Sequence, residues 1–272
     1  GGEYLSIRQL LAELVEQKQV PRSHELTFQR FQLCTDLLAD QAALRSCGNA
    51  ETLVSAMVKC RPLPATIDKS LDAASLLSQA QSLWETADPQ TMSPSQRGLL
   101  LRIAALQRSV KEPAWKITEL ESQVTASQTI NDLDLLQQLQ LMDLTRQLIC
   151  CLLEPAWMQT PAIISYARSY FPNLREAELV AGSDLQIEQL ATTVQQYPEA
   201  WQDYFCFMLL DFASADRDLK EAPLALALRW TDRLEITERF REIAQRELRL
   251  RKMQFAEIIR ERDQILAAAD RG

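Results

Sequence analysis

Apolar residues recur at three- and four-residue intervals along most of the chain, and no segment alternates with period two for more than a few residues. The first spacing places apolar side chains on one face of an α-helix, whereas the second is typical of a half-buried strand. Proline and glycine mark helix ends, as at Gly48 and at the pair Pro62 and Pro64. The expected helices span residues 10–20, 23–47, 50–60, 67–84, 94–110, 132–153, 155–171, 184–197 and 237–269, with a helical hairpin between the last two. The pattern therefore predicts an all-α fold with a long C-terminal helix.

A short repeat suggests how these helices are grouped. The tetrapeptide Glu-Pro-Ala-Trp occurs twice, ending at Trp115 and at Trp157, and a permuted copy ends at Trp201. The tryptophans lie 42 and 44 residues apart, which is about the length of one antiparallel helix pair with its turns. A proline in the first helical turn after an acidic residue is a typical helix start. We therefore expect stacked helical hairpins, with each of these tryptophans buried in the core of its unit.

Breaks in the apolar pattern suggest a division into subdomains. The stretch Asp88–Pro94 contains two prolines and no apolar periodicity, so it is the clearest candidate for a linker. A second break follows at Pro172. The expected subdomains are residues 3–88, 94–172 and 173–272, and Gly1 and Gly2 are expected to be a tag remnant.

Glycine and histidine are too scarce for several common kinds of active site. Only three of the six glycines lie away from the two ends of the chain, so glycine-rich phosphate loops are excluded. His24 is the only histidine, which rules out His-His metal sites, Ser-His-Asp triads and Cys-His dyads built within the chain. We therefore expect a protein that is not an enzyme and has no cofactor.

Cysteine usage and the length of the apolar stretches bear on the compartment. The six cysteines form no Cys-x-x-Cys pair, and the first residues show no secretory pattern, so reduced thiols in the core are expected. The longest apolar stretches, such as Cys206–Leu210, are far shorter than the roughly 20 residues that span a bilayer. We expect a cytoplasmic protein with no membrane span.

Carboxylates gather in one short window, Asp211–Glu221, which also contains Asp216 and Asp218. Oxygen ligands at this spacing, on a helix end and the turn after it, could hold Ca²⁺ or Mg²⁺. The EF-hand pattern is not met, because its central glycine and its final glutamate are missing. In the structural alternative, Asp218 caps the next helix and Glu221 completes a capping box. Asp216, Asp218 and Glu221 are therefore candidate ligands of a divalent cation.

The segment of about residues 204–250 around this window resembles the helical TerB-like module of bacterial tellurite-resistance and related stress proteins. That module has an apolar helix ending in Ala-Asp-Gly, an apolar residue two positions later, and acidic residues that open the next helix. Three positions match: Asp216, Leu219 and Glu221. Arg217 replaces the glycine, and Pro223 replaces a further acidic residue. The resemblance implies a helical binding or sensing module whose acidic window takes a divalent cation.

Charge is unevenly distributed along the chain. The net charge is −8 at pH 7, but residues 229–272 carry a net of +2 and the remainder a net of −10. Six basic residues lie close together in the last expected helix: Arg239, Arg241, Arg246, Arg249, Arg251 and Lys252. Such a surface favours an acidic protein partner, because the acidic remainder of the chain would repel nucleic acid. The alternative is a solvated helix whose glutamates and arginines pair with one another.

Together these features favour a non-catalytic adaptor or regulator that binds another protein, in a bacterial stress or regulatory system. Stacked helices leave concave and terminal surfaces open to partners. Two alternatives remain open. One is a divalent-metal-binding TerB-like module. The other is a regulator of the gatekeeper type found in secretion systems, since those proteins are also stacked short helical bundles.

Overall fold

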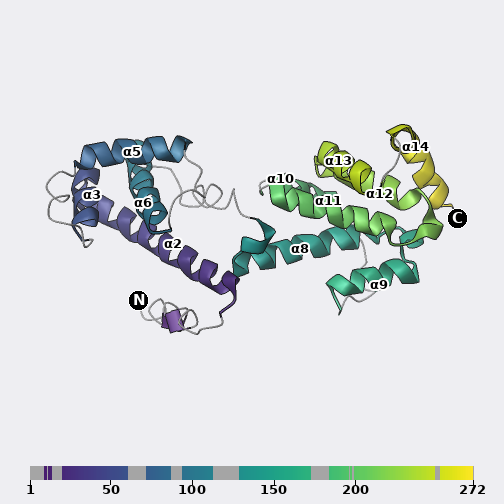
Figure 1. The fold of residues 1–272 in the computed structure, drawn as a ribbon, viewed down its shortest axis with the longest axis horizontal. Coiled ribbons are helices and arrows are strands. Elements are labelled where there is room, and N and C mark those ends of the chain that lie inside the picture. The colour runs from purple at the N-terminus through teal and green to yellow at the C-terminus, as the bar shows by residue number, and fades with distance from the viewer. Residues whose placement is uncertain are drawn as a thin grey trace. The chain divides into compact units, whose positions relative to one another are not determined.

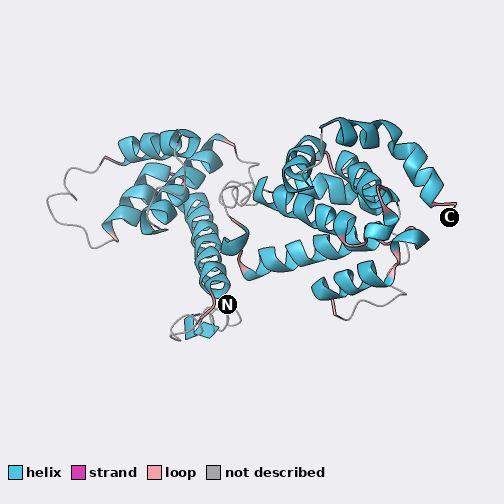
Figure 2. Ribbon diagram, turned by 45° about the vertical axis from the view of Figure 1, so that its right-hand side comes forward, coloured by secondary structure: helices cyan, strands magenta, loops and turns pink. Residues whose placement is uncertain are grey.

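The computed structural model describes residues 9–10, 12–13, 20–60, 72–86, 94–112, 129–172, 184–195, 197, 199–248 and 252–271. Within these ranges the chain forms eleven α-helices of ten or more residues, with short 3₁₀ turns and no strand (Figure 2). The all-α prediction is thereby confirmed. None of the described helices is both long enough and apolar enough to cross a membrane.

The chain divides into two compact units, Gly1–Ser127 and Gln128–Gly272. The first, called here the N-terminal unit, contains α2 (Arg22–Cys47), α3 (Ala50–Lys59), α5 (Ala73–Thr86) and α6 (Pro94–Lys111) (Figure 1). In it α6 packs against α5 and α2, and α3 packs against α5. The buried residues that these helices share form a small core of Val54, Val58, Ala80, Ile103, Ala104 and Leu106.

The helix boundaries around Gly48 follow from local chemistry that the sequence makes visible. Gly48 adopts a left-handed conformation with φ of 67°, and its N–H donates to the carbonyl of Leu44 at 2.8 Å. This is the usual glycine C-cap, which costs little only where no Cβ is present. The side chain of Asn49 then accepts from the N–H of Thr52 at 3.0 Å and starts α3. Both helices therefore begin and end within one residue of the predicted positions.

The division into units differs from the three subdomains expected from the sequence. The boundary between Ser127 and Gln128 lies inside the expected middle subdomain, residues 94–172. The expected linker, Asp88–Pro94, lies largely outside the described residues, and it connects α5 with α6, which pack against each other. This stretch therefore lies between two helices that pack against each other, and the division between the units comes later in the chain.

The C-terminal unit, Gln128–Gly272, contains seven described α-helices. They are α8 (Leu135–Leu152), α9 (Pro161–Tyr170), α10 (Asp184–Gln195), α11 (Glu199–Ser214), α12 (Ala222–Arg233), α13 (Thr237–Leu248) and α14 (Lys252–Ala269). Nine of the twelve residues of α12 are buried, and this helix packs against α11, α13 and α14. A helix that is buried on nearly every side belongs at the centre of a bundle, so α12 is the core of this unit.

The two tryptophans of the repeat that the structure describes are not equivalent. Trp201 lies in the first turn of α11 and is 1% exposed. Trp157 instead lies in a 3₁₀ turn, Ala156–Met158, is only half-buried, and donates from Nε1 to Oδ1 of Asp270 at 2.8 Å. The expected helix start at Pro155 is therefore wrong, because α9 begins at Pro161 with Thr160 as its cap. Trp115 lies outside the described residues.

Candidate functional site

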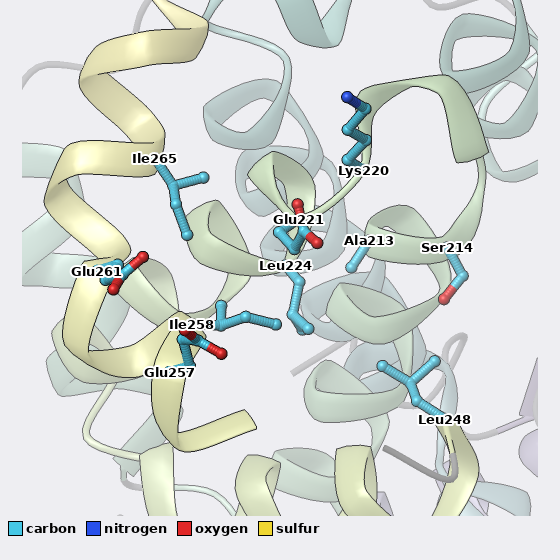
Figure 3. A pocket seen from close by; sticks show the side chains of 10 residues that line it. All are labelled: Ala213, Ser214, Lys220, Glu221, Leu224, Leu248, Glu257, Ile258, Glu261 and Ile265. Carbon is cyan, nitrogen blue, oxygen red and sulfur yellow. The ribbon is translucent and has the colours of Figure 1, made fainter. Parts of the chain in front are cut away.

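A groove with a volume of about 570 Å³ opens on the C-terminal unit, between the α11–α12 turn and α14 (Figure 3). Its floor is apolar, with Leu224 from α12 and with Ile258 and Ile265 from α14. Leu224 is 5% exposed and Ile258 is 8% exposed, whereas Ile265 is half-buried. We call this feature the α12–α14 groove. Ile265 is therefore the most accessible of these three floor residues, with Leu224 and Ile258 largely covered beside it.

Charged side chains stand at the rim of the groove. Glu221 precedes the first residue of α12, and Glu257 and Glu261 lie one helical turn apart on α14. Lys220 is the single basic side chain among the lining residues. Three carboxylates against one ammonium give the lining a net charge of −2. The groove therefore combines an apolar floor with an acidic rim.

Two of the rim carboxylates have a basic neighbour outside the lining. Arg260 donates to Glu261 at 2.8 Å and lies 3.7 Å from Glu257. The Arg260 side chain is 71% exposed, and ion pairs at such solvated positions contribute little free energy. A binding partner can therefore compete with Arg260 for these two carboxylates.

The carboxylates of the acidic window Asp211–Glu221 have different hydrogen-bond partners. Asp211 accepts a hydrogen bond from the Tyr166 hydroxyl at 2.9 Å. Asp216 is the N-cap of a 3₁₀ turn, Arg217–Leu219, and accepts from the N–H of Asp218 at 3.0 Å. The Thr160 hydroxyl is the main group that lowers the pKa of Asp216, and the Asp218 N–H adds to this effect. The Asp211 and Asp216 carboxylates are thus occupied by local hydrogen bonds.

The capping box expected at Asp218 and Glu221 is wrong. The N-cap of α12 is Glu221 itself, which makes no side-chain capping bond, and Pro223 stands in the first turn. The chain reverses at Lys220, whose φ is 52°, so α12 begins after this turn and not at Asp218. Proline fits the first turn of a helix because its missing N–H has no helical partner there.

The structure also bears on the metal hypothesis. Among the described residues, which include Asp216, Asp218 and Glu221, no three His, Cys, Asp or Glu side chains come together in a group that could hold a metal ion. Of the three candidates, only Glu221 lines the groove. The spacing along the sequence suggested a ligand set, but Asp216 instead caps the 3₁₀ turn that contains Asp218.

The basic residues of the expected last helix fall on two helices. Arg239, in α13, donates to both carboxylate oxygens of Asp203 and lies 3.1 Å from Glu199, both in α11. The hydrogen bond to Asp203 is the main cause of the raised pKa of Arg239. These contacts tie α13 to α11, so Arg239 is not free for a partner.

The other basic residues of this set are less available to a partner than the sequence suggested. Arg241 donates to Glu238 at 2.7 Å, and Arg246 donates to Glu247 at 2.9 Å. Arg249 and Arg251 lie outside the described residues, and Lys252 is described only as the first residue of α14. Every arginine of this set that the structure describes is therefore paired with a carboxylate of the same chain.

Sequence reasoning missed most of the groove. Glu257, Ile258, Glu261 and Ile265 fall on one stripe of a helix, and this spacing was visible in the sequence. The opposing wall, Glu221 and Leu224, lies more than 30 residues earlier. Which helix packs against α14 depends on tertiary structure that periodicity does not contain.

No protein-family model matches the chain, and no curated protein or solved structure matches it either.

Proposed function

We propose that this protein is a non-catalytic helical adaptor or regulator that binds another protein through the α12–α14 groove. The observation that supports this function best is the groove of about 570 Å³ between two helices, with Leu224, Ile258 and Ile265 at its floor. Apolar grooves between helices are a recurrent recognition surface for amphipathic segments of other proteins. The expected contact is therefore a side-chain anchor on the floor, with polar contacts around it.

The chemistry of the lining also supports binding rather than catalysis. The hydroxyl of Ser214 donates to the carbonyl of Leu210 at 2.9 Å, and the groove lining provides no histidine to act as its base. The carboxylates of Glu221 and Glu257 are exposed to solvent at the rim. These groups are suited to recognising charge.

The TerB-like resemblance of about residues 204–250 remains the reason to place this function in a bacterial stress or regulatory system. It covers α11, α12 and α13, which hold one wall of the groove. The gatekeeper alternative predicts the same mode of binding with a partner from a secretion system. The identity of the partner therefore separates these two settings.

Site-specific photocrosslinking tests the proposed surface. A photoreactive residue is placed at Ser214, which is exposed at the groove, and in a matched variant at Gln147, which is exposed on α8 of the same unit. We expect one crosslinked protein from position 214 only, displaced by excess unlabelled protein but not by the Ile265→Asp variant. Equal crosslinking from position 147, or displacement by Ile265→Asp, would contradict the proposal.

A further inference from the structure

We propose that the segment bound in the α12–α14 groove is a basic amphipathic helix of a partner protein, with apolar side chains on the floor and Lys or Arg at the rim. This inference rests on the proposed function and specifies the chemistry of the partner. The charge and the shape of the groove support it separately.

The shape of the groove fits a helix. One wall is a stripe of α14, in which Glu257, Glu261 and Ile265 recur every four residues beside Ile258. The other wall is the start of α12, where Leu224 is the apolar residue. A helix laid between two helices presents anchors at similar three- and four-residue intervals, so its apolar stripe can follow the stripe of α14.

The position of the polar groups argues against a small-molecule pocket. Small-molecule sites of comparable volume enclose the ligand and place a few polar groups so that they converge on it. In this groove, the polar groups stand at the rim, and Glu221 and Glu257 are exposed. The floor consists of hydrocarbon side chains, which can anchor an apolar residue but do not orient a polar ligand.

The charge of the rim selects a basic segment. Glu221, Glu257 and Glu261 lie on both sides of the apolar floor, and Lys220 stands at one end of α12 (Figure 3). An acidic helix would bring like charges next to these carboxylates, which opposes binding. A basic helix would instead gain one ion pair on each wall and displace the solvated pair that Arg260 makes.

Fluorescence anisotropy with the full chain and synthetic helices tests this directly. The probe is a labelled, end-capped 18-residue peptide of Leu and Lys, with Leu at helical positions i, i+3, i+4 and i+7. We expect it to bind the wild-type chain, and we expect its Glu-for-Lys counterpart not to bind. The triple variant Glu221→Gln, Glu257→Gln, Glu261→Gln should weaken binding by about tenfold or more.

Two matched controls separate the groove from the general acidity of the chain. The variant Asp143→Asn, Glu235→Gln, Glu242→Gln removes the same amount of charge from exposed positions outside the groove, and should change the dissociation constant by less than about twofold. Ile265→Ala on the floor should weaken binding, whereas Ile164→Ala, a half-buried residue of α9, should not.

The outcomes that would overturn the inference are distinct from those that would overturn the proposed function. Equal weakening by both triple variants, equal binding of the acidic peptide, or no binding of either peptide would each show that the groove does not select a basic helix. Crosslinking from Ser214 to a partner would still support protein binding in each of these cases. Failure of that crosslinking as well would remove both proposals.

Discussion

The buried carboxylate of Asp40 ties α2 to α6 in the N-terminal unit. Asp40 is 6% exposed and accepts from Arg102 through both oxygens, at 2.6 Å and 2.8 Å. Removing Asp40 takes away the buried partner of Arg102 and leaves this partly buried charge paired with the exposed carboxylate of Asp36. We expect Asp40→Ala to lower the free energy of unfolding of this unit by about 3 kcal/mol in urea denaturation.

Asp36 provides the matched control for this prediction. It lies 3.0 Å from the same arginine, but its side chain is 51% exposed. Solvent-exposed ion pairs contribute about 0–1 kcal/mol, so Asp36→Ala should have a small effect. Equal destabilisation by the two variants would show that burial does not decide the contribution of these carboxylates.

Two buried thiols in the C-terminal unit predict a dependence of stability on pH. Burial is the main cause that raises the pKa of Cys206 to about 12 and that of Cys151 to about 11. An unfolded thiol ionises near pH 9, so above this pH the unfolded state binds fewer protons than the folded state. Each thiol therefore makes its full contribution to the free energy of unfolding below about pH 8.5. This contribution is lost as the pH rises toward the pKa of that thiol in the folded state.

The measurement is urea denaturation at pH 8 and pH 10. Wild type should lose on the order of 1 kcal/mol more between these values than Cys206→Ala, which lacks one of the thiols. At pH 8, iodoacetamide should label exposed Cys47 well before Cys206. If the free energy of unfolding depends on pH in the same way in wild type and in Cys206→Ala, or if Cys206 is labelled rapidly, then Cys206 is not a neutral buried thiol.

At the scale of an element, α8 depends on a buried capping box. Asp134 is 2% exposed and accepts from the N–H of Gln137 at 2.9 Å, while the Gln137 side chain accepts from the N–H of Asp134 at 3.1 Å. Removing an N-cap side chain lowers stability by about 0.5–2 kcal/mol. Because this cap is buried, we expect a loss near the upper end of that range. Asp134→Ala should therefore lower the melting temperature of the C-terminal unit.

Asp143 is the control for the cap, because it is an exposed residue within the same helix. Asp143→Ala should leave the melting temperature unchanged or raise it slightly, since alanine favours helix interiors. A drop as large as that of Asp134→Ala would mean that any loss of charge from α8 is destabilising and that the cap has no special role.

Elements bounded by strong local signals were predictable from the sequence, and others were not. The limits of α2, α3 and α6 follow from Gly48, Asn49 and Pro94, whose effects on the backbone act within one turn. The tetrapeptide Glu-Pro-Ala-Trp that ends at Trp157 predicted a helix start at Pro155, and this prediction was wrong. The helix begins at Pro161 instead, with Thr160 as its cap. Where two candidate helix starts lie within a few residues of each other, the sequence pattern alone does not show which of them begins the helix.

The candidate site depends on contacts that join distant parts of the sequence. Arg239 was expected at a free surface, but its partner Asp203 lies 36 residues earlier in the chain. The expected ligands do not form a cation site, because Asp216 caps the 3₁₀ turn Arg217–Leu219 and Glu221 faces the groove. Periodicity predicted helix throughout residues 257–265, and only the fold shows that α12 forms the opposite wall of the groove.

At the scale of the whole molecule, the division at Ser127 predicts that the C-terminal unit folds by itself. Its buried apolar residues form one continuous core from Leu133 to Leu266. A compact unit with its own core is expected to fold as a domain. Residues 128–272 expressed alone should show a helical circular dichroism spectrum and one cooperative thermal transition. A broad, non-cooperative transition would show that this unit requires the other.

The most direct test of the α12–α14 groove is methyl NMR of the full chain labelled at isoleucine, titrated with the Leu and Lys helix. The account predicts that the resonances of Ile258 and Ile265 shift, because both line the groove. Those of Ile149 and Ile163, both 0% exposed in the core, should stay in place. Shifts that leave Ile258 and Ile265 unaffected, or no shifts at all, would contradict the groove as the binding surface.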